Sequence, residues 1–301
     1  MTLRDGLAAI LVVTILGLAF VAIKVGLETV PPLMLCALRF GFAALPAALL
    51  IRPPRAPVAL VAGFGMALGV GQFGLLMTAI RFGMPAGLSS LLIQVQVPFT
   101  VALAWAVQKE RPRGLQMLGG GIALVGVAAV ALGRGGGAPL GPLLLVVGAA
   151  LAWASANVIV KRIGRVDRLA LMVWGSLATT PPLLILSLII EGPGALAGLT
   201  HPSWGAIGSV AFQAYPTTLL AFGLWSGLLT RYPAATVTPF ALLVPVAGIL
   251  STHLVVGEPL SADILVGGGL ILAGIALSLR GGRTAADPSA RAKATAPPEV
   301  A

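Results

Sequence analysis

The residues best suited to binding a polar solute lie at the middle of a long apolar segment. Gln94 and Gln96 stand there, and Pro98 follows them. Proline has no backbone N–H, so the carbonyl of Gln94, four residues back, loses its helical donor. An amide and a free carbonyl at one depth can replace the hydration of a solute. The two glutamines are two residues apart and are therefore expected on different faces of the helix.

Similar residue types stand inside other apolar segments. They are Gln72, Trp153, Asn157, Gln213 and Tyr215. Polar groups at that depth must face protein or water rather than lipid. Two interpretations stay open: these side chains line a solute cavity, or they hydrogen-bond neighbouring helices. We favour a cavity-lining role for Gln94 and Asn157.

Arg39 is the one formal charge well inside an apolar segment. An ionisable group at such a position is a functional candidate. The guanidinium fork matches the geometry of a carboxylate, so one interpretation is that Arg39 binds an acidic group of a ligand. The other is a structural ion pair with Glu28, which stands near the same end of the bundle. Residue types alone leave both open.

Other carboxylates offer little for chemistry inside a membrane. Glu28, Glu110, Glu191, Glu258 and Asp263 all stand at the ends of apolar segments, so no carboxylate is expected to carry protons at mid-depth. A ligand ammonium group would then be solvated by neutral oxygens and by the face of Trp153, as a cation–π contact.

Motifs for catalysis or metal binding are missing from the sequence. There is one cysteine, Cys36, and none of the three runs of three glycines is followed by the Lys-Ser/Thr of a phosphate loop. A membrane enzyme would need paired carboxylates or a histidine cluster at one face. We therefore expect no catalytic residue, metal or cofactor. A passive channel or scaffold remains as a further alternative.

The elements that must hold these residues are transmembrane helices. Of 301 residues, 58% are hydrophobic and 9% charged, whereas soluble domains carry about 25% charged residues. About 20 apolar residues span a bilayer. Ten spans are predicted, at 6–26, 33–51, 58–80, 85–107, 114–132, 140–160, 169–190, 204–229, 234–256 and 263–279. Residues 281–301 have no apolar surface to bury and are expected to be a disordered cytoplasmic tail.

The net charge of +10 reflects orientation in a membrane rather than binding of nucleic acid. With the N-terminus in the cytoplasm, fifteen Lys and Arg residues fall on the inner side and three on the outer side. Short cytoplasmic loops are enriched in these residues. Both termini are therefore predicted to be cytoplasmic.

The chain repeats itself at a distance of 148 residues. Pro85, Glu110 and Gly126 correspond to Pro233, Glu258 and Gly274 without a gap, and Lys24 of the first span aligns with Lys161 at a distance of 137. Residues 1–134 and 138–280 thus form two five-helix halves. Because five is odd, the second half enters the membrane inverted. Inverted repeats are typical of secondary transporters with a binding site near the midplane.

Several stretches carry a family resemblance over residues 4 to 280. They are GLAFVAIK at 17–24, PPLMLCALRF at 31–40, RFGMPAGLSSLLIQVQ at 81–96, RYPAATVTPFALLVPVAG at 231–248 and GEPLS at 257–261. The chain resembles the EamA group of the drug/metabolite transporter superfamily. Within that group it is most similar to members that export O-acetylserine and cysteine from the bacterial inner membrane. The group often has Trp-Gly and a following Asn in the first helix, where this chain has Leu16-Gly17 and Ala19.

The resemblance implies a ten-helix inner-membrane exporter of small amino-acid metabolites that works by alternating access. Export of other amino acids or small drugs is the alternative. Together with the polar residues above, the first helix contributes Phe20, which lies in the stretch that carries the resemblance. The expected substrate-binding residues are Phe20, Arg39, Gln72, Gln94, Gln96, Trp153, Asn157, Gln213 and Tyr215.

Overall fold

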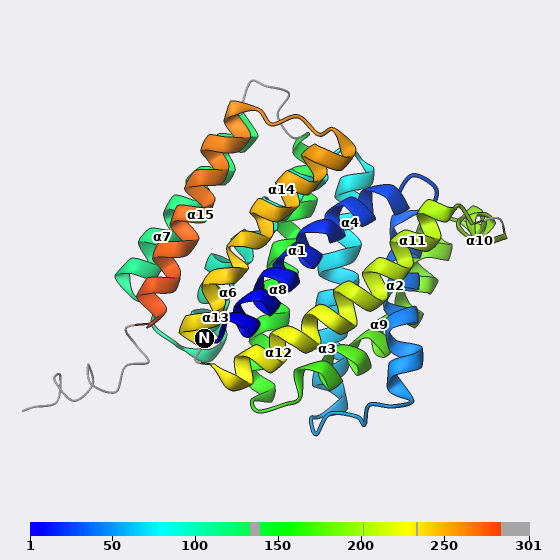
Figure 1. Cartoon of the computed structure of the whole chain (residues 1–301), viewed down its shortest axis with the longest axis horizontal. Coiled ribbons are helices and arrows are strands. Elements are labelled where there is room, and N and C mark those ends of the chain that lie inside the picture. The colour runs from blue at the N-terminus through cyan, green and yellow to red at the C-terminus, as the bar shows by residue number, and fades with distance from the viewer. Residues whose placement is uncertain (133–138, 201, 233, 284–301) are drawn as a thin grey trace, which may run out of the picture.

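The protein is seen in a computed structural model that describes residues 1–132, 139–200, 202–232 and 234–283. Over these ranges the chain forms helices and no strands (Figure 1). Nine helical segments there are long and apolar enough to cross a membrane, and one further apolar helix is shorter. The prediction of an all-α membrane protein with ten spans is confirmed.

The first half holds five spans. They are α1 (Leu3–Gly26); α2 (Pro32–Ala48); α3, η1 and α4 (Val58–Gly65, Met66–Gly74, Leu75–Arg81); α5, η2 and α6 (Ala86–Leu92, Ile93–Val95, Gln96–Gln108); and α7 (Gly114–Leu132). The second span ends three residues earlier than predicted. Arg52 precedes two prolines, and the residue before a proline disfavours helical geometry, so the chain leaves the helix early.

The second half repeats this order. Its spans are α8 (Leu140–Ile163); α9 (Arg168–Ile190); α11, η4 and α12 (Trp204–Phe212, Gln213–Ala221, Phe222–Arg231); α13 and α14 (Ala234–Ala241, Leu243–Val256); and α15 (Ala262–Arg283). Short helices η3 (Pro193–Leu196) and α10 (Ala197–Thr200) fill the longer connection after α9. Helix α15 continues to Arg283, into the predicted tail, and residues 284–301 lie outside the described ranges.

Two spans contain a π-helical stretch at equivalent positions of the repeat. Both η1 and η4 are nine residues long, and they start 147 residues apart, one residue short of the repeat distance of 148. In η4, Pro216 lacks a backbone donor, and Thr218 Oγ1 donates to the carbonyl of Gln213, 2.8 Å away. Such wide turns are rare and recur at functional sites. The side chains of each π-helical stretch therefore point in other directions than they would on a regular α-helix.

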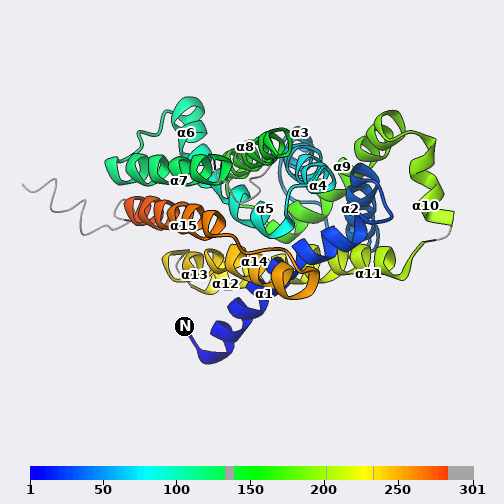
Figure 2. The same ribbon diagram turned by 90° about the horizontal axis from the view of Figure 1, so that it is seen from above.

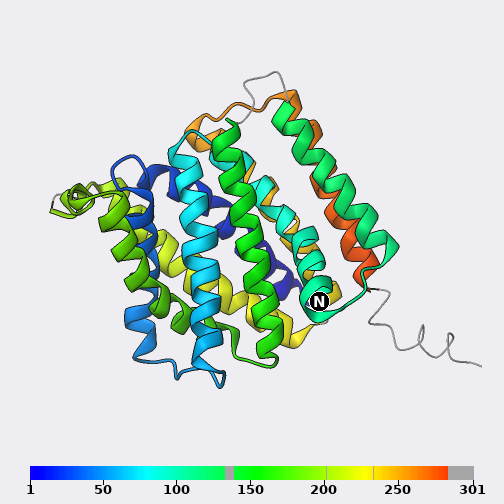
Figure 3. The same cartoon turned by 180° about the vertical axis from the view of Figure 1, so that it is seen from behind.

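Equivalent helices of the two halves pair in opposite directions. Helices α7 and α15 lie side by side along one edge of the bundle in Figures 1 and 3. Gly126, late in α7, meets Gly267 at the start of α15, whereas Gly119, early in α7, meets Gly274. This antiparallel contact is what two inverted five-helix repeats require.

Helices α2 and α9 show the same antiparallel pairing. The carboxylate of Glu191, just past the end of α9, accepts hydrogen bonds from the first backbone N–H groups of α2, at Leu33 (2.7 Å) and Met34 (3.1 Å). These donors have no partner within their own helix, so the side chain from one half caps a helix of the other.

The alternation of helices separates two ends of the bundle. At one, called here the basic end, lie the N-terminus and the connections α2–α3, α6–α7, α8–α9 and α12–α13 (Figure 1). Their cations are Arg52, Arg55, Lys109, Arg111, Arg113, Lys161, Arg162, Arg165, Arg168 and Arg231. The other end, called the far end, carries Glu191 and Glu258.

Candidate functional site

Arg39 lies fully inside the bundle, held between the two π-helical stretches. The residue is 1% exposed. Its Nε donates to Oγ1 of Thr218 in η4 at 3.3 Å, and its guanidinium carbon lies 3.8 Å from the ring centre of Phe73 in η1. A cation over an aromatic face is stabilised by the quadrupole of the ring. A second ring, that of Phe40, has its centre 5.3 Å from the same carbon, so the protein holds the guanidinium with one hydroxyl and two aromatic rings.

No carboxylate of the described residues lies within ion-pair distance of Arg39. Glu28 is exposed at the end of α1, so the interpretation that it neutralises Arg39 is wrong. A buried charge without a counter-ion is costly, because its hydration is lost and no attraction replaces it. The arrangement is suited to an anion supplied from outside the protein.

Further polar atoms without partners surround the same part of the fold. Buried atoms with no hydrogen-bond partner include Arg39 Nη1, Gln72 Oε1, Thr179 Oγ1, Gln213 Oε1 and Thr217 Oγ1. They come from α2, η1, α9 and η4, and α2, which carries Arg39, contacts each of the other three elements. We call these five residues the Arg39 cluster. An unmade buried hydrogen bond costs about 1–3 kcal/mol, so the cluster is a set of open donors and acceptors.

A second polar group joins α6 to α8. Nδ2 of Asn157 donates to Oε1 of Gln96 at 2.7 Å and to Oγ1 of Thr100 at 3.2 Å. Thr100 in turn donates to the carbonyl of Gln96 at 2.7 Å. We call these three residues the Asn157 cluster. It contains one helix from each half, as a site at the repeat interface would.

Gln94 does not join this group. Its side chain is 8% exposed, and Gln96 rather than Gln94 meets Asn157. The backbone also differs from the expectation of a regular helix, because η2 winds more tightly before Pro98 and the N–H of Gln96 points to the carbonyls of Ile93 and Gln94. Local tightening into a 3₁₀ turn is a common response to a missing α-helical bond.

The other predicted residues are spread around these two groups. Trp153 and Phe73 are half-buried and pack in the same apolar clusters, between α8 and η1. Phe20 is buried beside Gly248 of α14. Tyr215 is 42% exposed and lines a mostly apolar cavity of about 440 Å³ between α2 and α11, whose lining includes none of the other predicted residues.

Sequence reasoning missed Thr100, Thr179 and Phe73. Thr100 stands four residues after Gln96 and so shares its helical face, which was visible in the spacing. Phe73 and Thr179 carry no such signal, because contacts between distant helices decide where they lie.

Comparison with known proteins decides the family. The model of the EamA-like transporter family matches residues 6–132 and again residues 140–280. This chain belongs to the EamA-like transporter family. The double match covers both halves of the repeat, so each half carries one unit of the family.

Curated relatives cover nearly the whole chain. A probable amino-acid metabolite efflux pump of Salmonella typhimurium is 39% identical over 290 residues, which is 94% of this chain and 97% of that protein. A pump of the same description in Escherichia coli K12 is 37% identical over 288 residues, with 93% and 96% covered. As an EamA-like transporter, the protein moves a small molecule across a membrane.

A solved crystal structure shares the fold of this EamA-like chain. It is 20% identical in sequence and superposes with a TM-score of 0.61, over 94% of this chain and 99% of the other. At that identity the likeness concerns the arrangement of helices alone.

Proposed function

We propose that the protein exports small amino-acid-type metabolites across the bacterial inner membrane by alternating access. O-acetylserine and cysteine are the preferred substrates, and export of a wider range of amino acids or small drugs is the alternative. Residues 1–134 and 138–280 are the two halves that move relative to each other. The observation that carries the proposal is Arg39, a buried guanidinium with an unpartnered Nη1 and no carboxylate beside it.

A substrate carboxylate completes the contacts of Arg39. Thr218 and Phe73 fix the guanidinium on two sides and leave Nη1 as the free donor. A planar guanidinium binds a carboxylate with defined geometry, whereas a point charge such as Lys does not. Every amino acid supplies one carboxylate, so this contact selects the class and not the side chain.

The ammonium group of the substrate needs acceptors, and the site offers neutral ones. Gln72 Oε1 and Gln213 Oε1 are buried acceptors without donors in the Arg39 cluster. Trp153 packs in the same apolar cluster as Phe73, and Asn157 stands closer to the basic end, six residues before the end of α8. Neutral acceptors replace the hydration of a cation without adding a negative charge, so the zwitterion stays balanced by Arg39 alone.

The orientation of the protein in the membrane follows from the charges of the basic end. The ten Lys and Arg residues in the short connections at that end favour a cytoplasmic location for it. The far end then faces outward. Since Arg39 is sealed from solvent at 1% exposure, substrate reaches it only when the surrounding helices move. The antiparallel pairing of equivalent helices supports such a movement, because each half can take the conformation of the other.

The test uses a pair of substrates that differ by the carboxylate. Export of labelled cysteine and of cysteamine, which lacks the carboxylate, is measured from cells with and without the protein. We expect the protein to favour cysteine, and Arg39→Gln to remove that preference. A charge-assisted hydrogen bond contributes about 1.5–3 kcal/mol, so cysteine export should fall roughly 10- to 150-fold.

The control variant is Ser155→Ala, because the hydroxyl of Ser155 bonds only to the carbonyl of Leu151 in its own helix. It should export cysteine at the parental rate. The amount of each variant in the membrane is measured alongside. Equal cysteine export with and without the protein refutes the substrate, and parental export by Arg39→Gln refutes the role of Arg39. A panel of other amino acids distinguishes narrow from wide specificity.

A further inference from the structure

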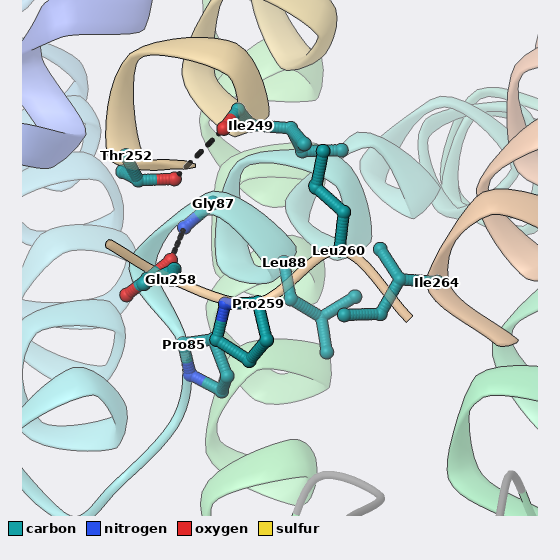
Figure 4. A pocket seen from close by; sticks show the side chains of 9 residues that line it. All are labelled: Pro85, Gly87, Leu88, Ile249, Thr252, Glu258, Pro259, Leu260 and Ile264. Atoms are coloured by element: carbon teal, nitrogen blue, oxygen red, sulfur yellow. Dashed lines mark hydrogen bonds between the residues drawn. The ribbon is translucent and has the colours of Figure 1, made fainter. Parts of the chain in front are cut away.

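The far end is held shut by one carboxylate that crosses from α14 to α5. Glu258 follows α14, and its two oxygens accept from the N–H groups of Ala86 (2.7 Å) and Gly87 (2.8 Å). Figure 4 shows the bond from Gly87. These N–H groups open the fourth span and have no partner within it. The negative charge also interacts favourably with the positive end of the helix dipole.

Packing around this contact is tight. All residues of α5 are buried. A Cβ on Gly87 would lie 3.1 Å from Cα of Ile249 and would clash with the hydroxyl of Thr252. Figure 4 shows Leu88 and Ile249 facing the same small cavity beside Glu258. The start of α5 and the end of α14 therefore touch backbone to backbone.

The repeat places a second carboxylate in the same setting at the basic end. At a distance of 148 residues, Glu258 corresponds to Glu110, and the N–H groups of Ala86 and Gly87 correspond to those that open α13 at residues 234 and 235. Glu258 follows Gly257 with φ 73°, and Glu110 follows Lys109 with φ 60°. Lys109 is the one non-glycine residue of the described chain with a positive φ, a conformation that lysine rarely adopts.

The backbone bonds of the two turns also correspond. The N–H of Glu258 bonds to the carbonyl of Thr252 at 3.3 Å, and the N–H of Glu110 bonds to the carbonyl of Ala104, its repeat equivalent, at 3.4 Å. The turn that presents Glu258 to α5 is thus built a second time, and it presents Glu110.

Yet Glu110 has a different partner in this structure. Its carboxylate pairs with Lys161 at the end of α8, and the two side chains are 50% and 53% exposed. In Figure 2, α6 and α13 lie apart, whereas their equivalents α14 and α5 are in close contact. The far end is closed and the basic end is open between these helices.

The lysine completes the correspondence. Lys161 is equivalent to Lys24 of α1 in the alignment of the first helices of the halves. The pair Glu110–Lys161 therefore has an unmade counterpart, Glu258–Lys24. By the symmetry of the repeat, each glutamate has two possible partners: the N-terminus of a helix in the opposite half, and a lysine. In this structure Glu258 bonds to the helix N-terminus and Glu110 pairs with the lysine.

We propose that Glu258 and Glu110 are alternating latches of the transport cycle. In the state seen here Glu258 caps α5 and Glu110 is held by Lys161. In the opposite state Glu110 caps α13 at residues 234 and 235, and Glu258 moves to Lys24. This exchange of partners between the two glutamates rests on the proposed alternating access. Each of the two states then has one capped helix and one ion pair. Two arrangements of similar energy are what a two-state element needs.

The test compares two disulfide pairs placed by the repeat, in a Cys36→Ala background. Leu88→Cys with Ile249→Cys reports closure of the far end. The equivalent pair Thr236→Cys with Val101→Cys reports closure of the basic end. Yields of both crosslinks are measured in membranes after oxidation, without substrate, and are normalised to the protein present. Both crosslinks should form in the parental glutamate background.

Removing a latch should change the ratio of far-end to basic-end crosslinking in opposite directions. A capped helix contributes more than an exposed ion pair. Glu258→Ala is expected to lower the ratio about tenfold, and Glu110→Ala to raise it about tenfold, each equal to about 1.4 kcal/mol. Glu28→Ala, an exposed glutamate outside the repeated turn, should leave it unchanged.

The proposal is overturned if the Thr236–Val101 pair does not crosslink, or if Glu110→Ala and Glu28→Ala give the same ratio. Since the assay contains no substrate, a wrong substrate assignment leaves these results untouched. Conversely, an unchanged ratio with intact cysteine export would reject the latches and keep the proposed function.

Discussion

The contact between α7 and α15 is close enough that one added methyl group should separate the two helices. A Cβ on Gly274 would lie 2.5 Å from the carbonyl oxygen of Gly119 and 2.6 Å from the nitrogen of Ala123. Both are backbone atoms of the partner helix, so no side chain can rotate away. Small residues permit this approach between membrane helices, where packing rather than the hydrophobic effect holds them together.

The magnitude follows from that geometry. Ordinary contact needs about 3.4 Å, so Gly274→Ala must displace α15 by about 1 Å, and a gap of that size forfeits roughly a quarter to a half of each dispersion contact. Overpacking typically costs about 1–3 kcal/mol, while alanine itself favours a helix by up to about 1 kcal/mol. We expect a net destabilisation of about 1–2 kcal/mol.

The same run of glycines supplies the control. A Cβ on Gly269, in the same helix, would meet no atom within 4 Å, so Gly269→Ala should keep or raise stability. The repeat equivalents behave alike: a Cβ on Gly126 would lie 2.7 Å from the carbonyl oxygen of Gly267, whereas a Cβ on Gly121 would meet no atom within 4 Å. Thermal unfolding of the purified variants in detergent measures the difference.

Equal unfolding temperatures for Gly274→Ala and Gly269→Ala would refute the packing argument. The double variant Gly126→Ala with Gly274→Ala gives a further check. Because both lie on one seam, the second methyl group should cost less once the first has separated the helices. Strict additivity would mean that the two sites act independently.

Three further outcomes follow from individual contacts. Asn157→Ala removes the hydrogen bonds between α6 and α8 and should reduce export several-fold, while the amount of protein in the membrane stays normal. The control Ser155→Ala should export at the parental rate. Glu191→Ala leaves two N–H groups of α2 bare and should lower the free energy of unfolding by about 1–3 kcal/mol, measured against Glu28→Ala. Tyr215→Ala should leave export near the parental rate, because its side chain lines the cavity beside α11.

Much of the architecture could be predicted from composition and repetition. The scarcity of charge required lipid as the solvent, and the repeat of 148 residues required an inverted second half, since five spans reverse the direction of the chain. Both conclusions rest on the average properties of long stretches of sequence, so a local irregularity in one helix does not change them. For the same reason the span boundaries were correct to within a few residues, and the largest difference is the four residues by which α15 runs on to Arg283.

Individual site contacts were harder to predict. Gln96 instead of Gln94 meets Asn157 because η2 tightens the helix and changes which face each side chain takes. Arg39 was singled out for its charge and the structure places it inside the bundle, but its neighbours Phe73 and Thr218 reach it through π-helical stretches that no periodicity in the sequence revealed. One changed turn rotates every later side chain, so these contacts depend on geometry that residue types do not encode one by one.

The sequence by itself determined the lipid-embedded ten-helix plan, its internal symmetry and the uneven distribution of cations between its two ends. The tertiary structure alone decided how that symmetry is broken. Glu258 and Glu110 occupy equivalent positions in the sequence, yet one caps a helix and the other pairs with a lysine. Two equivalent halves allow two equivalent arrangements, and only the folded chain, by packing α5 against α14, selects one of them.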